Sequence, residues 1–445
     1  MNDFSRHFDE NRSVWLADKA PYVRTEALTS DRAADVVIIG GGFTGLSTAY
    51  HLSKRFPEKS VVILEAREVG SGASGRNGGQ MLNWVHGFEP RSPEEARRIY
   101  EATREGIVST LAIVSEHGLP VPMRSEGHLD LVTTARAADE SQGALEAIAG
   151  SGIPLRFLGR SELRKQIELE GVEGAIFDPG GGEIDGLAYL RGLRPVLEAR
   201  GVTIFESTPV VRIREGRTIE VETPRGTVRA PAAVLATNAY TPHLGYFRSG
   251  IVPLHSHALA TESLPAEEWA RRGFRSGANF IDDRPRISYG TMTGSGRVLF
   301  GGGSNRAYRY LYGNGTRSEG PSDRSVEDMR RRLVSYLPRL EGVAITHRWS
   351  GPVALTLSRL PTMGVRGAHR NLYFAVGYSG HGITLSNLAG KVLTDLYSRA
   401  DERWRGLPFY QRTLRYVPSE PFRFLGYHIF TRLTGRSPRV QDPLR

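Results

Sequence analysis

Residues 35–67 read DVVIIGGGFTGLSTAYHLSKRFPEKSVVILEAR and decide the fold. An apolar strand, a glycine turn, a helix and a second apolar strand follow one another, and this order predicts a βαβ unit. Gly40 permits the tight turn, Gly42 lets the backbone approach a pyrophosphate, and Gly45 allows the helix to pack closely on the strand. Because the first N–H groups of a helix have no partner within it, the turn predicts a phosphate site.

Glu65 ends the second strand, 20 residues after Gly45. A carboxylate at this position can accept hydrogen bonds from the ribose of a dinucleotide whose 2′-hydroxyl is free. A GxGxxG pattern alone is weak, but here a strand precedes it, a helix follows it and the acid stands at the expected spacing. The alternative is a glycine turn without a ligand. The combination predicts a dinucleotide-binding unit.

A second glycine-rich loop, EVGSGASGRNGGQ at residues 68–80, comes directly after the second strand. A domain that binds NAD needs no further phosphate-wrapping loop at this point, whereas an extended FAD does. Glu65 places the loop beside the cofactor, although a flexible surface loop is the alternative. We therefore expect FAD rather than NAD.

The composition limits both the compartment and the cofactor chemistry. The 445 residues exceed what one hydrophobic core usually serves, and the chain has no cysteine. The absence of cysteine excludes disulfides, thiolate metal sites and a flavin attached through cysteine sulfur. No histidine lies in residues 66–80 either, so we expect FAD to be bound non-covalently. A reducing cytoplasm fits, since residues 1–34 lack the apolar run of a signal peptide.

The formal net charge is +10, but 53 of the 58 basic residues are arginines dispersed along the chain. A nucleic-acid groove would gather basic residues with aromatic ones, and no such clustering is seen. We interpret the charge as solvated faces and expect no nucleic-acid partner.

The remaining segments indicate a second domain. Helical spacing at 90–120 precedes a strand at 128–134, the pattern returns to helix and strands at 186–240, and 251–345 is rich in strands. We expect a mixed α/β (α+β) fold with a Rossmann-like FAD-binding domain and a second, antiparallel-sheet substrate domain. The expected ranges are 30–89 with 155–250 and 346–400 for the first domain, 90–154 with 251–345 for the second, and 401–445 for a C-terminal tail.

Four ordered motifs resemble the D-amino-acid-oxidase-like FAD-dependent oxidoreductases, and within them the gamma-glutamylputrescine oxidase group. They are GGGFTGLSTA, GSGASGRNGGQ, WSGPVALTLSRLPTMG and GYSGHGITLSNLAGKV. The resemblance implies a discontinuous flavin domain and a substrate domain whose sheet covers one face of the flavin ring. By position it implies cofactor contacts from Gly40, Gly42, Phe43, Thr44, Gly45, Glu65, Ala66, Arg67, Ser74, Arg76, Asn77, Gly78, Gly79, Gln80 and Val211, and flavin-ring contacts from Gly380, His381, Gly382 and Thr384.

The chain departs from the family pattern at two places. Some relatives hold a substrate α-carboxylate with an arginine where this chain has Val353, so simple α-amino acids become less favoured substrates. Many oxidases of the family place a lysine over the flavin for the reaction with oxygen, but residues 166–390 contain no lysine. Oxygen as the physiological acceptor is therefore in doubt.

Amine oxidation by a flavin requires a neutral amine in a dry site and no strong nucleophile. The candidate catalytic residues near the flavin are His381, His255, Tyr289 and Trp349. His255 and His257 lie on the same face of one strand. The alternative to a catalytic role is that they are hydrogen-bonded core residues. Their spacing could bind a metal, but no carboxylate cluster supports a metal site there. Trp349 has interface packing as its alternative.

The resulting hypothesis is an FAD-dependent amine or amino-acid oxidase or dehydrogenase that takes hydride from the carbon beside nitrogen. The substrate would be a polyamine-derived amine such as gamma-glutamylputrescine, or a secondary amine, with Arg286, Arg306 and Arg309 as candidates for a distal carboxylate. The alternatives are a dehydrogenase that passes electrons to a membrane quinone and a nucleic-acid-modifying flavoenzyme. Membrane contact is expected only through the tail, where residues 422–436 read as an amphipathic helix or as a segment packed on the flavin domain.

Overall fold

The first core is a six-stranded sheet. The computed structural model describes residues 11–17, 21–85, 88–317 and 320–434. The sheet runs in the order β10, β3, β2, β14, β22, β21, and only β21 is antiparallel to its neighbour. Its strands are Thr203–Phe205, Val61–Leu64, Val36–Ile39, Ala232–Leu235, Leu372–Val376 and Thr362–Arg366. Continuous apolar strands of this kind are typical of parallel sheets covered on both faces.

Alternate residues of β2 and β3 enter two different hydrophobic clusters. Val36 and Ile38 pack with the helices, and Val37 and Ile39 pack on the opposite face. The helices are α2 (Phe43–Arg55), α3 (Pro93–Glu116), α6 (Gly186–Ala199) and α9 (Gly382–Tyr397). The opposite face is covered by a small sheet of β1 (Arg32–Ala33), β13 (Gly226–Ala230), β12 (Ile219–Thr223) and β11 (Arg212–Arg214). The predicted Rossmann-like unit is confirmed.

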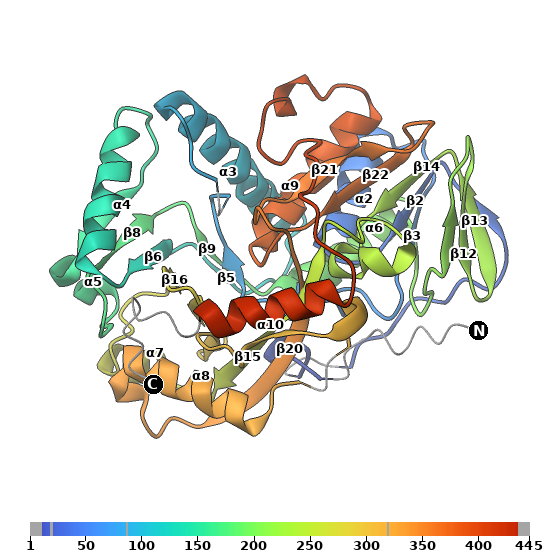
Figure 1. The fold of residues 1–445 in the computed structure, drawn as a ribbon. Helices are drawn as coiled ribbons and strands as arrows, with labels where there is room; N and C mark the ends of the chain where they lie inside the picture. Colours follow the sequence, from blue (N-terminus) through green and yellow to red (C-terminus); the bar gives the residue numbers. More distant parts are fainter. Residues whose placement is uncertain (1–10, 18–20, 86–87, 318–319, 435–445) are drawn as a thin grey trace.

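The second core is a nine-stranded sheet in which only β16 and β6 run parallel. The order is β19, β15, β18, β17, β16, β6, β8, β7, and β20 pairs with β15. The strands are Tyr308–Tyr310, Val252–Thr261, Val298–Gly302, Ser288–Met292, Asn279–Asp282, His128–Val132, Gly174–Asp178, Arg156–Gly159 and Ile345–Leu355. Helices α4 (Ala135–Ala147), α5 (Arg160–Gln166), α7 (Ala266–Arg271) and α8 (Asp323–Tyr336) accompany it (Figure 1).

Strand pairing divides the chain differently from the ranges expected above. Strands β7 and β8 lie within residues 155–178, which we expected in the FAD-binding domain, yet they pair in the nine-stranded sheet, as does β20. Helix α3, expected in the substrate domain, contributes Ile99 and Ile107 to the cluster of the parallel sheet. Pairing partners far apart in sequence leave no local signal, which explains the difference.

A small three-stranded sheet and two further helices complete the fold. A three-stranded sheet orders β4 (Gln80–Met81), β9 (Gly182–Ile184) and β5 (Met123–Arg124), and the short helix α1 (Val14–Ala17) packs nearby with Trp349. The tail forms helix α10 (Phe422–Thr434), which Figure 1 shows on the outside of the molecule near β15.

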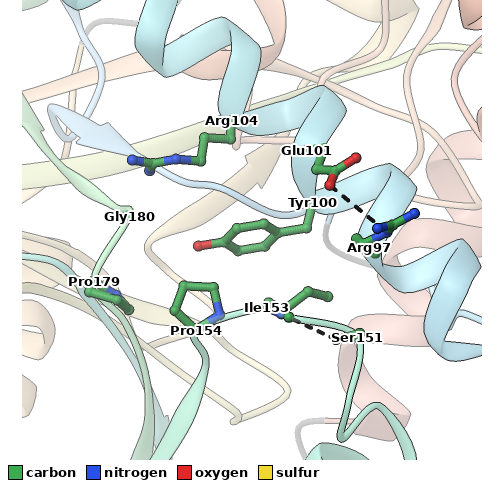
Figure 2. Close-up of a pocket in the computed structure, with 10 residues that line it drawn as sticks. Arg97, Tyr100, Glu101, Arg104, Ser151, Ile153, Pro154, Pro179 and Gly180 are labelled. Carbon is green, nitrogen blue, oxygen red and sulfur yellow. Dashed lines mark hydrogen bonds and ion pairs between the residues drawn. The ribbon is translucent and has the colours of Figure 1, made fainter.

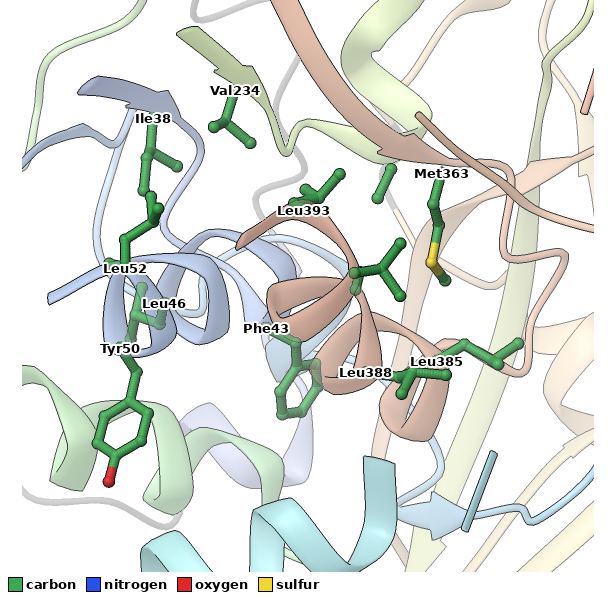
Figure 3. Close-up of a cluster of buried hydrophobic side chains, with 14 of the residues drawn as sticks. Ile38, Phe43, Leu46, Tyr50, Leu52, Val234, Met363, Leu385, Leu388 and Leu393 are labelled. Carbon is green, nitrogen blue, oxygen red and sulfur yellow. The ribbon is translucent and has the colours of Figure 1, made fainter. Parts of the chain in front are cut away.

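Helices α2 and α9 pack at unusually close range. A Cβ placed on Gly390 would lie 2.1 Å from Ser47 Oγ and 2.6 Å from the Ser47 carbonyl oxygen. Ser47 Oγ donates to the Asn387 carbonyl at 2.6 Å. Figure 3 shows Leu46 of α2 and Leu385 and Leu388 of α9 within the same apolar cluster. Glycine at 390 is therefore required by contact and not by backbone angle.

We predict that Gly390→Ala lowers the free energy of unfolding by about 1–3 kcal/mol, because the new methyl group forces the two helices apart. Denaturant unfolding of the FAD-bound protein measures this. Gly143→Ala is the matched control: it is also a helical glycine, but a Cβ there meets nothing within 4 Å. The control should gain up to about 1 kcal/mol from helix propensity. Equal effects of the two substitutions would contradict the close-contact explanation.

Candidate active site

Two glycine turns meet at one edge of the parallel sheet. Strands β2 and β22 flank β14, and all three run parallel, so the turns after β2 and β22 leave from the same edge. The first turn enters α2 and the second enters α9. Thr44 Oγ1 and Tyr378 Oη lie 2.8 Å apart and join the two turns. Two helix N-termini side by side favour negative charge at this point.

The first turn has the backbone geometry that its glycines predict. Gly40 has a φ of +110°, and a Cβ on Gly45 would lie 1.9 Å from the Gly40 carbonyl oxygen. Phe43 follows, buried, with its ring stacked on Tyr189. Gly40 is therefore required by its backbone angle and Gly45 by its close contact with the Gly40 carbonyl.

Glu65 lies against this turn. Its Oε2 accepts from the Gly41 N–H at 2.7 Å and its Oε1 from the Arg67 N–H at 2.9 Å, while burial raises the pKa of the carboxyl. The Thr208 N–H donates to the Glu65 carbonyl at 2.8 Å and so brings the segment before Val211 alongside. Glu65 and its neighbour Ala66 thus stand where the ribose contact is expected.

The backbone of Val211 is already engaged in part. Its N–H donates to the Glu222 carbonyl at 2.9 Å within the small sheet. The neighbouring Val210 is a core residue of the cluster behind the parallel sheet. A contact of Val211 with adenine stays a prediction. The Val211 N–H would not make this contact, because it already donates to Glu222.

The 68–80 loop is held firmly across the start of α2. Ser74 Oγ accepts from the Phe43 N–H at 3.1 Å. Asn77 Nδ2 donates to the Ser74 carbonyl at 2.6 Å, and its Oδ1 accepts from the Gly79 N–H at 2.9 Å. The buried Arg76 donates from Nη1 to the Ser71 carbonyl at 2.6 Å. These hydrogen bonds fix the conformation of the loop, as expected for a loop that wraps around a cofactor.

The end of the loop faces the nine-stranded sheet. Gln80 Nε2 donates to the carbonyls of Phe280 and Gly290, both at 3.0 Å. Trp349 Nε1 donates to the Arg76 carbonyl at 3.0 Å. A Cβ on Gly78 would lie 3.0 Å from the Tyr289 ring. The structure thus brings Tyr289 and Trp349 to the loop, and their expected place near the flavin stays a prediction.

The second turn provides the other wall. Gly380 has a φ of +100°, and its Cβ position is 3.9 Å from Val353 Cγ1. His381 is a buried residue at the N-cap of α9, followed by Gly382. Thr384 Oγ1 is buried and has no hydrogen-bond partner among the described residues. An unpartnered hydroxyl beside a helix N-terminus fits the polar edge of a flavin ring, so the residues present fit the cofactor.

The two strand histidines face elsewhere. His255 Nε2 lies 3.1 Å from the Gly315 carbonyl, and His257 Nδ1 lies 2.9 Å from Ser325 Oγ of α8. Burial lowers the pKa of both histidines to about 4, so they are neutral near pH 7. The side chains share one face, as predicted, and His257 meets α8 there, while His255 also lies within electrostatic reach of Arg76 in the 68–80 loop. Among the described residues no group of three potential metal ligands occurs.

The three arginines considered for a distal carboxylate do not gather beside the loop. Arg306 pairs with Asp328 at 2.6 Å. Arg286 lies over the Phe430 ring of α10, and Arg309 is exposed on β19.

Glu183 is the residue that sequence reasoning missed. It stands opposite Gln80 and Arg124 in the three-stranded sheet, and directly opposite residues share a face. The side chain is fully buried, and among the described residues no well-aligned hydrogen bond reaches its carboxylate; the Gly294 backbone N–H only partly offsets the loss of water. Burial raises the pKa of Glu183 to about 8, against the opposing effect of Arg124. An acid between Gly182 and Ile184, within an otherwise apolar strand, was the available signal.

The family model described as DAO, FAD dependent oxidoreductase, matches residues 35–396. The chain belongs to this family. The DAO chain is 31% identical over 88% of its length to a Haemophilus influenzae protein named probable oxidoreductase OrdL, covering 89% of that protein. It is 30% identical over 94% of its length to the gamma-glutamylputrescine oxidoreductase of Escherichia coli, covering 97% of it.

Solved structures agree with the fold. The glycine oxidase of Geobacillus kaustophilus matches 87% of this DAO chain and 100% of its own with a TM-score of 0.73, at 23% identity. The chain is thus an FAD-dependent oxidoreductase of a family whose members act on amines and amino acids. FAD, a Rossmann-like domain and this enzyme class were all predicted from the sequence, and all three are confirmed.

One cavity of about 500 Å³ lies apart from these residues. Figure 2 shows Tyr100 of α3 pointing across it toward Pro154 and Pro179. The Tyr100 hydroxyl donates to Asp178 Oδ1 at 2.8 Å. No residue of the two glycine turns or of the 71–80 segment lines this cavity, so we do not assign the chemistry to it.

We predict that Glu65→Ala lowers FAD retention, because charge-assisted hydrogen bonds to ribose contribute on the order of 1–3 kcal/mol. The measurement is flavin absorbance per mole of purified protein. Glu215→Ala, which removes a carboxylate remote from the turn, serves as the control. Release of intact FAD on denaturation would show that the attachment is non-covalent. Unchanged FAD occupancy in Glu65→Ala would mean that another residue makes the ribose contact.

Glu183 gives a pH prediction. Its pKa is higher in the folded state than the ordinary value of 4.5, so its favourable contribution is present below pH 4.5 and is lost as pH rises to about 8. The stability advantage of Glu183→Gln over the native protein should therefore grow across this range, to at most about 5 kcal/mol. Urea unfolding at several pH values measures it. A difference that does not change with pH would mean that Glu183 has an ordinary pKa.

Proposed function

We propose that the protein oxidises the C–N bond of an amine, with a polyamine-derived amine such as gamma-glutamylputrescine, or a secondary amine, as its substrate. The observation that carries the proposal is the meeting of two helix N-termini, joined by Thr44 and Tyr378, with a braced loop that Trp349 and Tyr289 cover. FAD, when bound, supplies a flavin that accepts hydride from the carbon beside nitrogen. The product imine then hydrolyses. The likeness to the Escherichia coli enzyme supports the substrate class.

The protein's own residues supply a dry, shaped site. Trp349 and Leu299 are buried in one cluster with Tyr289 packed against it, and together they exclude water from the side of the 76–78 segment. The N-terminus of α9 stabilises negative charge at the flavin edge when the cofactor is reduced. Hydride departure is favoured where water cannot compete for the amine.

We propose Glu183 as the residue that exchanges a proton with the incoming amine. Amines bind mostly as ammonium ions at neutral pH, whereas oxidation requires the neutral form. Burial keeps the Glu183 carboxyl mostly protonated at pH 7, but an ammonium ion beside it would favour loss of that proton to solvent, and the resulting carboxylate could then accept a proton from the amine. Its position opposite Gln80 places it on the loop's side of the small sheet.

The apolar side chain of Val353 disfavours substrates that carry an α-carboxylate. It lies beside Gly380 and offers no charge to an α-carboxylate. Of the arginines considered for a distal carboxylate, Arg306 is held by Asp328, Arg286 lies over the Phe430 ring and Arg309 is exposed on β19. Amines without an α-carboxylate therefore fit better than simple α-amino acids.

The test is anaerobic bleaching of the bound flavin by a panel of amines. We expect gamma-glutamylputrescine, other polyamine derivatives or secondary amines to bleach it at least tenfold faster than glycine or alanine. Glu183→Gln should shift the pH dependence of bleaching more than the final extent. Bleaching by 2-hydroxy acids with none by any amine would refute the proposal.

The electron acceptor is a separate prediction. A fixed cation beside the ring promotes the first electron transfer to oxygen, yet residues 166–390 hold no lysine and burial keeps His255 neutral. We expect reduced enzyme to react faster with a quinone or dye than with dissolved oxygen. Stopped-flow reoxidation measures both rate constants. An oxygen rate equal to the dye rate would favour an oxidase and direct attention to His381.

A further inference from the structure

Helix α10 is held to the body by one of its faces. Phe424 and Tyr427 pack against the cluster of Val252, Tyr310 and Val417. The Tyr427 hydroxyl donates to the Tyr308 carbonyl at 2.9 Å. The buried Arg423 donates from Nη2 to the Arg248 carbonyl at 2.8 Å. These contacts fix the position of the helix on the nine-stranded sheet, so the tail is packed, but on the second core and not on the flavin domain as the packed alternative had it.

The opposite face of α10 is also apolar, and it is exposed. Phe422, Leu425, Ile429 and Leu433 recur at the spacing of one helical face, with exposed fractions of 69%, 56%, 47% and 67%. Phe430 flanks them and is 59% exposed. Figure 1 shows α10 crossing the outside of the molecule with no other labelled element over it. A helix of a monomeric protein normally turns a polar face to water, so this face is built for contact with something else.

No acidic residue lies on this helix. Residues 421–434 contain no aspartate or glutamate, and the sequence from 435 to 441 adds Arg436 and Arg439 and no acid. Arg432 and His428 are exposed along the edge of the apolar face. The nearest acid before the helix, Glu420, turns inward and accepts from the Phe424 N–H at 3.1 Å. The exposed surface around α10 is thus complementary to a negatively charged partner.

We propose that α10 docks the protein on an anionic membrane surface, with the face of Phe422, Leu425, Ile429 and Leu433 at the boundary of headgroups and acyl chains. Apolar side chains beside arginines, on a helix that lies flat, are the arrangement of interfacial helices. The association would be peripheral: among the described residues no helix is long and apolar enough to cross a membrane. It would also bring the flavoprotein to lipid-soluble electron acceptors.

The test is flotation of the purified FAD-bound full chain with vesicles of phosphatidylcholine alone or mixed with phosphatidylglycerol. We expect binding to the mixed vesicles that weakens with salt. The double variant Leu425→Ser/Ile429→Ser should bind at least tenfold more weakly, and Arg432→Glu should bind more weakly than the native protein. Val108→Ser, which changes an apolar side chain of α3 that is 49% exposed, is the matched control and should bind as the native protein does.

Amine-dependent bleaching of the flavin in every variant reports folding and separates this proposal from the proposed function, because α10 contributes no residue to the glycine turns. Absence of native binding to the mixed vesicles would overturn the proposal. Equal binding of the double variant would overturn it as well. A concentration-dependent dimer that the double variant abolishes, without vesicle binding, would assign the face to a second copy of the chain instead.

Discussion

The contact of Ser47 on α2 with the backbone of α9 at Asn387 and Gly390 is the constraint from which the site follows. A side chain at 390 would separate the helices, and the two glycine turns that start them would no longer share one edge of the sheet. The Thr44–Tyr378 hydrogen bond then fixes the turns to each other. An anion-favouring point thus arises from packing between Ser47 in the second turn of α2 and the segment from Asn387 to Gly390 of α9, without a charged side chain directed at it.

The second sheet depends on the same arrangement. The 68–80 loop is held from one side by the start of α2, through Ser74, and from the other by the nine-stranded sheet, through Gln80 and Trp349. The bonds of Gln80 and Trp349 use backbone carbonyls as acceptors, so the contact between loop and sheet depends on the backbone paths of both. The loop therefore does two things: it closes the cofactor site and it sets the distance between the two cores.

Local signals predicted the parts of the fold that local physics determines. Gly40, Gly45 and Glu65 stand in short-range relations to one strand and one helix, and the structure has them where the spacing puts them. The pleat of β15 also predicted that His255 and His257 share a face. Which face that is depends on α8, more than 60 residues later, and no local pattern carries it. The same holds for the pairing of β7 and β8 and for the packing of α3.

Glu183 illustrates why buried acids are difficult to identify from sequence and informative in structure. A carboxyl that loses water without gaining a hydrogen bond costs stability, and its pKa moves toward neutrality in consequence. Folding alone would favour glutamine at this position. A chain that keeps the acid tolerates this cost, and a carboxyl whose pKa lies near neutrality can exchange its proton when an ammonium ion binds beside it, as the proposed function requires. The exposed apolar face of α10 can be interpreted in the same way. Exposed apolar surface and a buried acid both cost free energy in the isolated protein, and the proposed membrane surface and the proposed amine would offset these costs.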